Sequence, residues 1–172
     1  MKDLNEQERL ILSNQYKILS FIDKDNAKQH LDAAEIFEQG YEYLYNEYDN
    51  IPSPYSPEES KEVISILNLY RELNNSYKAA KDKDGLKESE VSFPGFDHND
   101  AKEAKMAIFA QFLTENLGRY DEIKSNLGGE HGWNSHCLMV PKYLRMIEKL
   151  DSMTPLANRY YSTDQIRKIL DA

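Results

Sequence analysis

The stretch from Gly128 to Cys137, GGEHGWNSHC, combines side chains whose types could do chemistry. It contains two of the four histidines, the single cysteine and the single tryptophan of the chain. His131, His136 and Cys137, with the Glu130 carboxylate, are of the types that bind zinc, and a thiol beside a histidine can become a nucleophile. A small metal-dependent or thiol hydrolase that uses this loop is therefore one hypothesis.

The spacing within this loop does not favour that chemistry. On a helix, His131 and His136 would diverge by about 140° and the neighbours His136 and Cys137 by about 100°, so only a loop could bring them together. The loop also lacks a repeated CxxC spacing and the order of residues found in a phosphate-binding loop. We therefore predict no catalytic residue, no metal site and no cofactor. The glycines are interpreted as a chain reversal that turns Trp133 inward and lets Asn134 bond to nearby backbone.

A second set of candidate residues lies at predicted helix ends and loops: Asp97, Arg119, Tyr120 and Arg145. Guanidinium groups in such places hold carboxylates in bidentate pairs or bond to the free carbonyls of helix ends. We favour a structural interpretation, in which these bonds hold loops in place, over a pocket for an anionic ligand. If the protein has a ligand site, the sequence predicts it here, next to His131 and Trp133.

Helical periodicity of the apolar residues organises most of the chain. The sequence predicts an all-α fold with about six helices and long loops, in a single compact helical domain over residues 1–172. Two capping boxes mark helix starts, Ser56 with Glu59 and Ser162 with Gln165. The tyrosine-rich segment 27–48 is predicted as one amphipathic helix. In the loop FPGFD, Phe93 and Phe96 are predicted to pack onto the helical core.

The first predicted helix carries apolar residues on more than one side. One sector holds the residues expected to face the core, Leu12, Tyr16 and Leu19, flanked by Ile11, Ile18 and Ile22. Leu10 and Phe21 lie on the opposite side, where contact with water would expose two large apolar groups. We therefore predict that Leu10 and Phe21 are covered, either within the fold or by a second subunit. They form a candidate self-association surface of a homo-oligomer.

Composition limits the partners and the compartment. The chain has 30 acidic and 21 basic side chains and a net charge of -9, which argues against direct binding of nucleic acid phosphates. A single cysteine cannot form an internal disulfide. The sequence shows no signal-peptide pattern at its start and no run that approaches the roughly 20 apolar residues of a membrane span. These features predict a cytoplasmic protein without a membrane segment.

Five motifs together resemble one family: RLILSNQYKIL (9–19), FPGFD (93–97), GRY (118–120), HGWN (131–134) and YLRM (143–146). They are similar to those of the YfbU family of bacterial proteins, in the same order over nearly the whole chain. The proline that follows HGWN, Pro141, stands farther from it than in the family. The resemblance implies a cytosolic, all-helical, self-associating protein, and it supplies no catalytic or binding residues to transfer. We therefore favour a non-enzymatic oligomeric interaction or regulatory protein, with the hydrolase as the alternative.

Overall fold

The computed structural model describes residues 4–48, 54–124, 132–155 and 160–172. These residues form eight α-helices, one 3-10 helix and one π-helical turn, and within them no strand occurs, so the predicted all-α class is confirmed. Helices outnumber the predicted six because several elements are short, such as α4 (Glu88–Val91) and α6 (Asp121–Lys124). The chain divides into two compact units, Met1–Pro54 and Tyr55–Ala172, each described by itself. A single domain over 1–172 stays a prediction.

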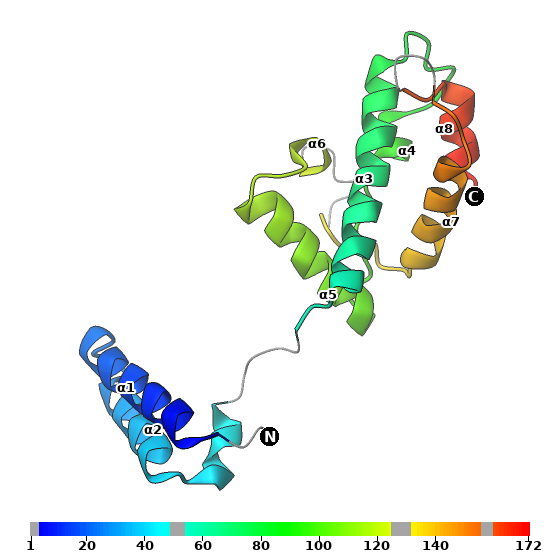
Figure 1. The fold of residues 1–172 in the computed structure, drawn as a ribbon. Helices are drawn as coiled ribbons and strands as arrows, with labels where there is room; N and C mark the ends of the chain where they lie inside the picture. The colour runs from blue at the N-terminus through cyan, green and yellow to red at the C-terminus, as the bar shows by residue number, and fades with distance from the viewer. Residues whose placement is uncertain (1–3, 49–53, 125–131, 156–159) are drawn as a thin grey trace. The chain divides into compact units, whose positions relative to one another are not determined.

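Unit 1 is a helical hairpin followed by a 3-10 helix (Figure 1). Helix α1 (Glu6–Ile22) starts with a capping box between Asn5 and Glu8. Helix α2 (Ala27–Gln39) ends at Gly40, whose φ of +73° is the left-handed conformation that glycine favours at helix ends. Residues Glu42–Glu47 then form the 3-10 helix η1. The prediction of one helix over 27–48 was therefore wrong, because Gly40 ends it.

The two helices of unit 1 meet through small side chains. Ser13 and Ser20 of α1 are buried, as are Ala33 and Ala34 of α2, and small residues let helix backbones approach closely. At one end of this contact the rings of Tyr16, Phe37, Tyr45 and Tyr48 pack together, with Tyr16 stacked on Phe37 at 5.6 Å between centroids. A hydrogen bond with His30, 3.0 Å long, lowers the pKa of Asp23 at the hairpin turn.

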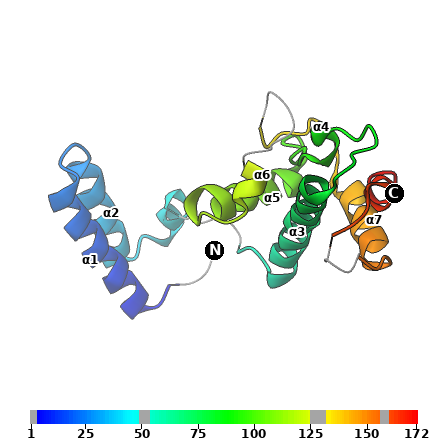
Figure 2. The same ribbon diagram turned by 90° about the horizontal axis from the view of Figure 1, so that it is seen from above.

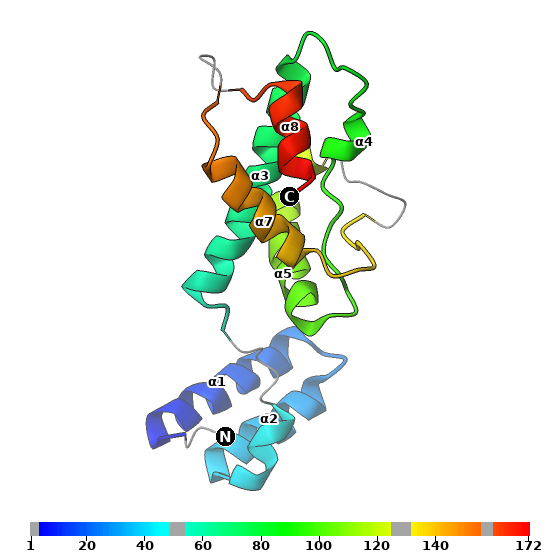
Figure 3. The same cartoon turned by 90° about the vertical axis from the view of Figure 1, so that its right-hand side faces the viewer.

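Unit 2 is built around helix α3 (Pro57–Ala79). Helix α5 (Ala101–Gln111) lies on one side of α3, and α7 (Val140–Asp151) with α8 (Thr163–Leu170) lies on the other (Figures 1 and 2). Figure 3, seen from the side of α7 and α8, shows α7 crossing α3. Both predicted capping boxes are confirmed, because Ser56 and Ser162 accept hydrogen bonds from the amides of Glu59 and Gln165, whose side chains reach back.

The core of unit 2 fills the space around α3. Phe93 and Phe96, from the loop after α4, are fully buried there, as predicted. Phe96 forms edge contacts with Phe93 and with Tyr143 of α7, and the ring of Phe93 is tilted against that of Tyr143. After α5 the chain makes a π-helical turn, η2 (Phe112–Asn116), before α6. Among the described residues, every helix is too short or too polar to cross a membrane.

Candidate functional site

The loop from Trp133 to Cys137 is joined to FPGFD by backbone hydrogen bonds. The amide of Phe96 donates to the Trp133 carbonyl at 2.8 Å, and the amide of Ser135 donates to the Phe96 carbonyl at 3.0 Å. The Asn134 side chain accepts from the amide of His136 at 3.0 Å. Trp133 is 6% exposed, and its indole donates to Glu115 of η2 at 3.2 Å. The prediction that Trp133 turns inward and Asn134 bonds to backbone is therefore confirmed.

A buried carboxylate holds the two loops against the helices. Glu103, in the first turn of α5, is 1% exposed. Its Oε2 accepts from the amide of Asp97 at 2.8 Å, and its Oε1 accepts from the amides of Met139 and Val140 at 2.9 and 2.8 Å. Three backbone donors therefore compensate the desolvation of this charge. Sequence reasoning missed Glu103, because a glutamate in the first turn of a helix usually faces water.

His131 lies outside the described residues, and the candidate ligand residues that are described have bonds to neighbours of their own. Asp97 and Trp133 share the loop pair, but the Asp97 carboxylate accepts from the backbone and side-chain nitrogens of Asn99, both at 2.9 Å. Tyr120 donates to the Asn68 side chain at 3.1 Å, and the Arg71 guanidinium lies over its ring at 4.1 Å. Arg119 is exposed, and its amide donates to the Leu113 carbonyl. These contacts hold loops to helices.

Arg71 also forms an ion pair with Glu122 of α6. Burial alone would raise the pKa of Glu122, but its hydrogen bond to Arg71 and the charge of that guanidinium lower the pKa overall. The cation over Tyr120 is therefore already balanced by a carboxylate. This arrangement stabilises the turn between η2 and α6.

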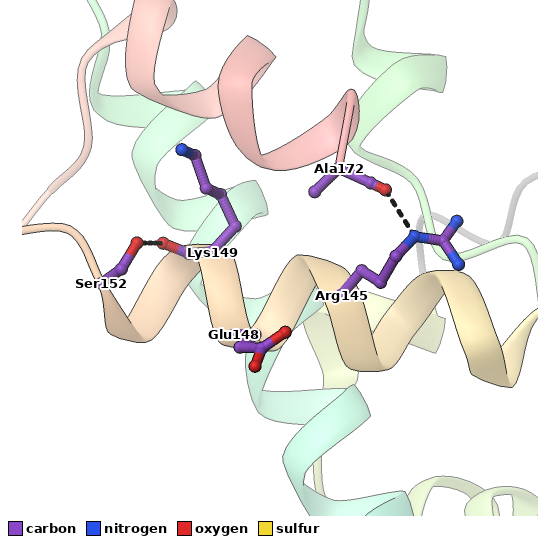
Figure 4. A pocket seen from close by; sticks show the side chains of 5 residues that line it. All are labelled: Arg145, Glu148, Lys149, Ser152 and Ala172. Atoms are coloured by element: carbon purple, nitrogen blue, oxygen red, sulfur yellow. Dashed lines mark hydrogen bonds between the residues drawn. The ribbon is translucent and has the colours of Figure 1, made fainter.

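Arg145 lies in an open groove of about 360 Å³ between α7 and the end of the chain (Figure 4). Its Nε donates to the Ala172 carbonyl at 2.9 Å and its Nη1 to the Pro141 carbonyl at 3.1 Å. Glu148 and Lys149 line the same groove with Ser152. Two of the Arg145 donors thus bond to carbonyl oxygens, and the groove is lined by side chains of both charges, Glu148 as well as Lys149.

The hydrolase residues are described only in part. Glu130 and His131 lie outside the described residues, so the convergence that a metal or thiol site requires stays untested. His136 is exposed with a φ of +56°, and Cys137 is an exposed free thiol whose sulfur lies 3.6 Å from that of Met139. Among the described residues no three His, Cys, Asp or Glu side chains are grouped to hold a metal ion.

Helix α1 presents five large apolar residues, each more than half exposed, along one face. We call this face the α1 stripe; it comprises Leu10, Ile11, Ile18, Phe21 and Ile22, which are 56–74% exposed. On an ideal helix these five positions span about 120° of the circumference, opposite the serines that meet α2. Ile11, Ile18 and Ile22, which the sequence places beside the sector expected to face the core, are therefore exposed. The face toward α2 carries Ser13 and Ser20, because the close approach of Ala33 and Ala34 requires small partners.

The described residues thus define an all-α protein of two helical units, with a continuous apolar stripe exposed on its first helix. The described parts of the loops that carry candidate chemical residues, 93–97 and 133–137, make hydrogen bonds that join the helices of unit 2. A model of the YfbU domain matches residues 1–172, the whole chain, and the protein therefore belongs to the YfbU family.

Proposed function

We propose that this protein is a non-enzymatic interaction protein that self-associates through the α1 stripe. The supporting observation is that unit 1 exposes more of its large apolar side chains than it buries. Among its described residues, the only large apolar side chains that are buried are Phe37 and Tyr45. The large apolar side chains that are exposed are far more numerous: Leu10, Ile11, Ile18, Leu19, Phe21, Ile22, Leu31, Tyr41 and Tyr43.

A unit of this size normally needs its large apolar residues for its own core, because small domains bury a smaller fraction of their surface. Unit 1 instead packs serines and alanines at the α1–α2 contact and exposes more of its aliphatic residues than it half-buries. Exposed apolar patches of this kind mark interaction surfaces. This distribution supports a helical hairpin whose exposed apolar residues are covered by a partner.

The energy of such an interface is sufficient for a reversible complex. Full burial of one Leu, Ile or Phe side chain stabilises by roughly 1.5–3 kcal/mol. Five side chains that are more than half exposed therefore offer on the order of 5–10 kcal/mol from each copy, or twice that over a symmetric pair. This offsets the roughly 4–15 kcal/mol lost in translational and rotational freedom on association. We expect a homo-oligomer that dissociates on dilution.

Charge and compartment fit the same proposal. The net charge of -9 supports protein partners over nucleic acids, whose phosphates it would repel. A cytoplasmic location and a regulatory role through the assembled oligomer are parts of the proposal. Exposed Tyr41 and Tyr43, which flank Glu42 beside the stripe-bearing hairpin, give the assembled protein an acidic, tyrosine-bearing surface for further partners.

Analytical ultracentrifugation of the full chain over a range of concentrations tests self-association. We expect an oligomer for the wild type, and monomers for Leu10→Glu and Phe21→Glu with unchanged helical circular dichroism. The matched control is Leu138→Glu in unit 2, because Leu138 is 60% exposed and Leu10 is 59% exposed. A wild type that stays monomeric up to its solubility limit would overturn the proposal.

Native mass spectrometry of untagged protein purified without a chelator tests the alternative in the same sample. One spectrum reports the number of subunits and the mass of any bound metal. A stoichiometric metal ion that is lost in His131→Ala would support the hydrolase and return attention to the loop 128–137. An oligomer without added mass, dissociated by Leu10→Glu, would support the interaction protein.

A further inference from the structure

The large apolar residues of the α1 stripe are spaced almost symmetrically along the helix, toward its start and toward its end, about position 16. Counted from Tyr16, Leu10 and Ile22 are each six residues away, and Ile11 and Phe21 are each five residues away. Ile18 is two residues after Tyr16, and Asn14 is two residues before it. The helix therefore has a pair of large apolar residues at each end of the stripe, placed symmetrically about its middle.

From this symmetry we infer that the α1 stripe is covered by α1 of a second copy that runs antiparallel to it. The inference rests on the proposed self-association and adds the partner surface and its direction. Around a two-fold axis at the height of residue 16, residues equally far from the middle reach the same height on opposite edges of the interface, so each residue packs on the neighbour that shares its edge. Leu10 then packs on Phe21 of the second copy, and Ile11 packs on Ile22 of the second copy.

Charges at the two ends of the stripe favour the antiparallel direction. Glu6 precedes Leu10 by one helical turn, so it lies beside Leu10 on the helix surface. At the other end, the Lys24 ammonium lies over the Phe21 ring, 5.2 Å from its centroid. The nearby Asp23 carboxylate already bonds to Asn26 and His30, both at 3.0 Å. Asp25 follows Lys24 in the turn, so this end is not basic overall, but Lys24 is the cation that lies on the stripe itself.

An antiparallel pair places Glu6 of each copy beside Lys24 of the other, which forms two complementary pairs. A parallel pair would bring Glu6 beside Glu6 and Lys24 beside Lys24, and like charges across an interface select against that arrangement. The opposite face of each α1 already packs on α2. Two hairpins joined in this way form a bundle of four helices with the two α1 helices at its centre.

Disulfide trapping tests the direction. In a Cys137→Ser background, which removes the single cysteine, we would prepare Leu10→Cys and Phe21→Cys separately, mix them and oxidise them slowly. The antiparallel pair predicts a mixed 10–21 disulfide as the dominant product. The two Leu10→Cys thiols would be about 18 Å apart along the axis, whereas a disulfide needs Cα atoms within about 7 Å.

Charge reversal gives an independent test without new thiols. We expect Glu6→Lys and Lys24→Glu each to weaken association by roughly ten-fold, because two pairs change sign in one dimer. The double variant is expected to recover wild-type affinity to within about two-fold, since it restores both pairs in reversed order. Circular dichroism of each variant reports whether the helices are retained.

The outcomes separate this inference from the proposed function. A wild type that sediments as a monomer overturns both. An oligomer that Leu10→Glu dissociates, but whose Leu10→Cys thiols pair with each other or form no disulfide with Phe21→Cys, overturns only the antiparallel arrangement. An oligomer in which the 10–21 disulfide dominates and the double reversal restores affinity supports both.

Discussion

The carbonyl of Trp133 lies against Gly95 so closely that no side chain fits between them. A Cβ on Gly95 would stand 2.1 Å from the Trp133 oxygen and 2.3 Å from its carbonyl carbon. Gly95 also has a φ of +95°, a conformation that L side chains rarely adopt. This contact aligns the two loops for the parallel bridge between Phe96 and Asn134.

We therefore expect Gly95→Ala to lower the free energy of unfolding by about 2–4 kcal/mol, because it adds a backbone clash to an unfavourable φ. Gly118→Ala is the matched control, since Gly118 has a φ of +60° but a Cβ added there would meet no heavy atom of the described residues within 4 Å. Its cost should stay near about 1 kcal/mol. Urea denaturation followed by Trp133 fluorescence measures both. Equal losses would show that the contact with Trp133 is unimportant.

Glu103→Gln is expected to destabilise unit 2 by about 2–3 kcal/mol. The amide has the shape of the carboxylate, but its NH₂ group must face at least one of the three backbone donors, from Asp97, Met139 and Val140. Glu62→Gln is the control, because Glu62 pairs with Lys102 at the surface, 2.9 Å away, where an ion pair contributes about 0–1 kcal/mol. Chemical denaturation compares the two, and a loss under about 1 kcal/mol for Glu103→Gln would contradict the assignment.

Glu103 illustrates what sequence cannot supply. Capping boxes such as Ser56 with Glu59 depend on residues three apart, so the sequence contains all the information that they need. The partners of Glu103 lie up to 37 residues away, and its burial follows from where α5 meets the start of α7. Similarly, periodicity located the apolar faces of α1 but not their direction, which depends on the alanines of α2.

The candidate residues of the loops show the same limit. Trp133 and Asn134 follow from local glycine and Asx preferences, and the structure confirms both. Arg145, by contrast, donates hydrogen bonds to the backbone carbonyls of Pro141 and Ala172. A pattern of side chains in the sequence does not indicate which backbone carbonyl will accept such a bond. Sequence therefore predicted that arginines would hold helix ends, without identifying which groups they hold.

Tyr55 gives a prediction for alkaline pH. Burial, with smaller contributions from the charges of Glu59 and Glu62, raises the pKa of Tyr55 to about 12. In the unfolded chain a tyrosine has a pKa of about 10. The unfolded state therefore loses this proton first, and the stabilisation present below about pH 10 is lost as the pH rises through about 12.

We expect Tyr55→Phe to reduce the loss of stability between about pH 9 and 12 by about 1 kcal/mol, after allowance for solvent screening. At neutral pH the same change should cost little, because the buried Tyr55 hydroxyl has no hydrogen-bond partner among the described residues. Tyr43→Phe, at a side chain that is 91% exposed, is the control. Urea unfolding at several pH values checks this, and identical pH profiles for Tyr55→Phe and the wild type would contradict it.

Unit 2 should fold without unit 1. Every residue of its hydrophobic core, from Val63 to Ile169, lies within Tyr55–Ala172. We expect a polypeptide of residues 55–172 to be helical, to unfold cooperatively with Trp133 shielded from water, and to sediment as a monomer, because it lacks the α1 stripe. The full chain under the same conditions is the control. If residues 55–172 still associate, the interface moves to exposed apolar residues of unit 2, such as Ile108 and Phe112, and the α1 stripe loses its proposed role.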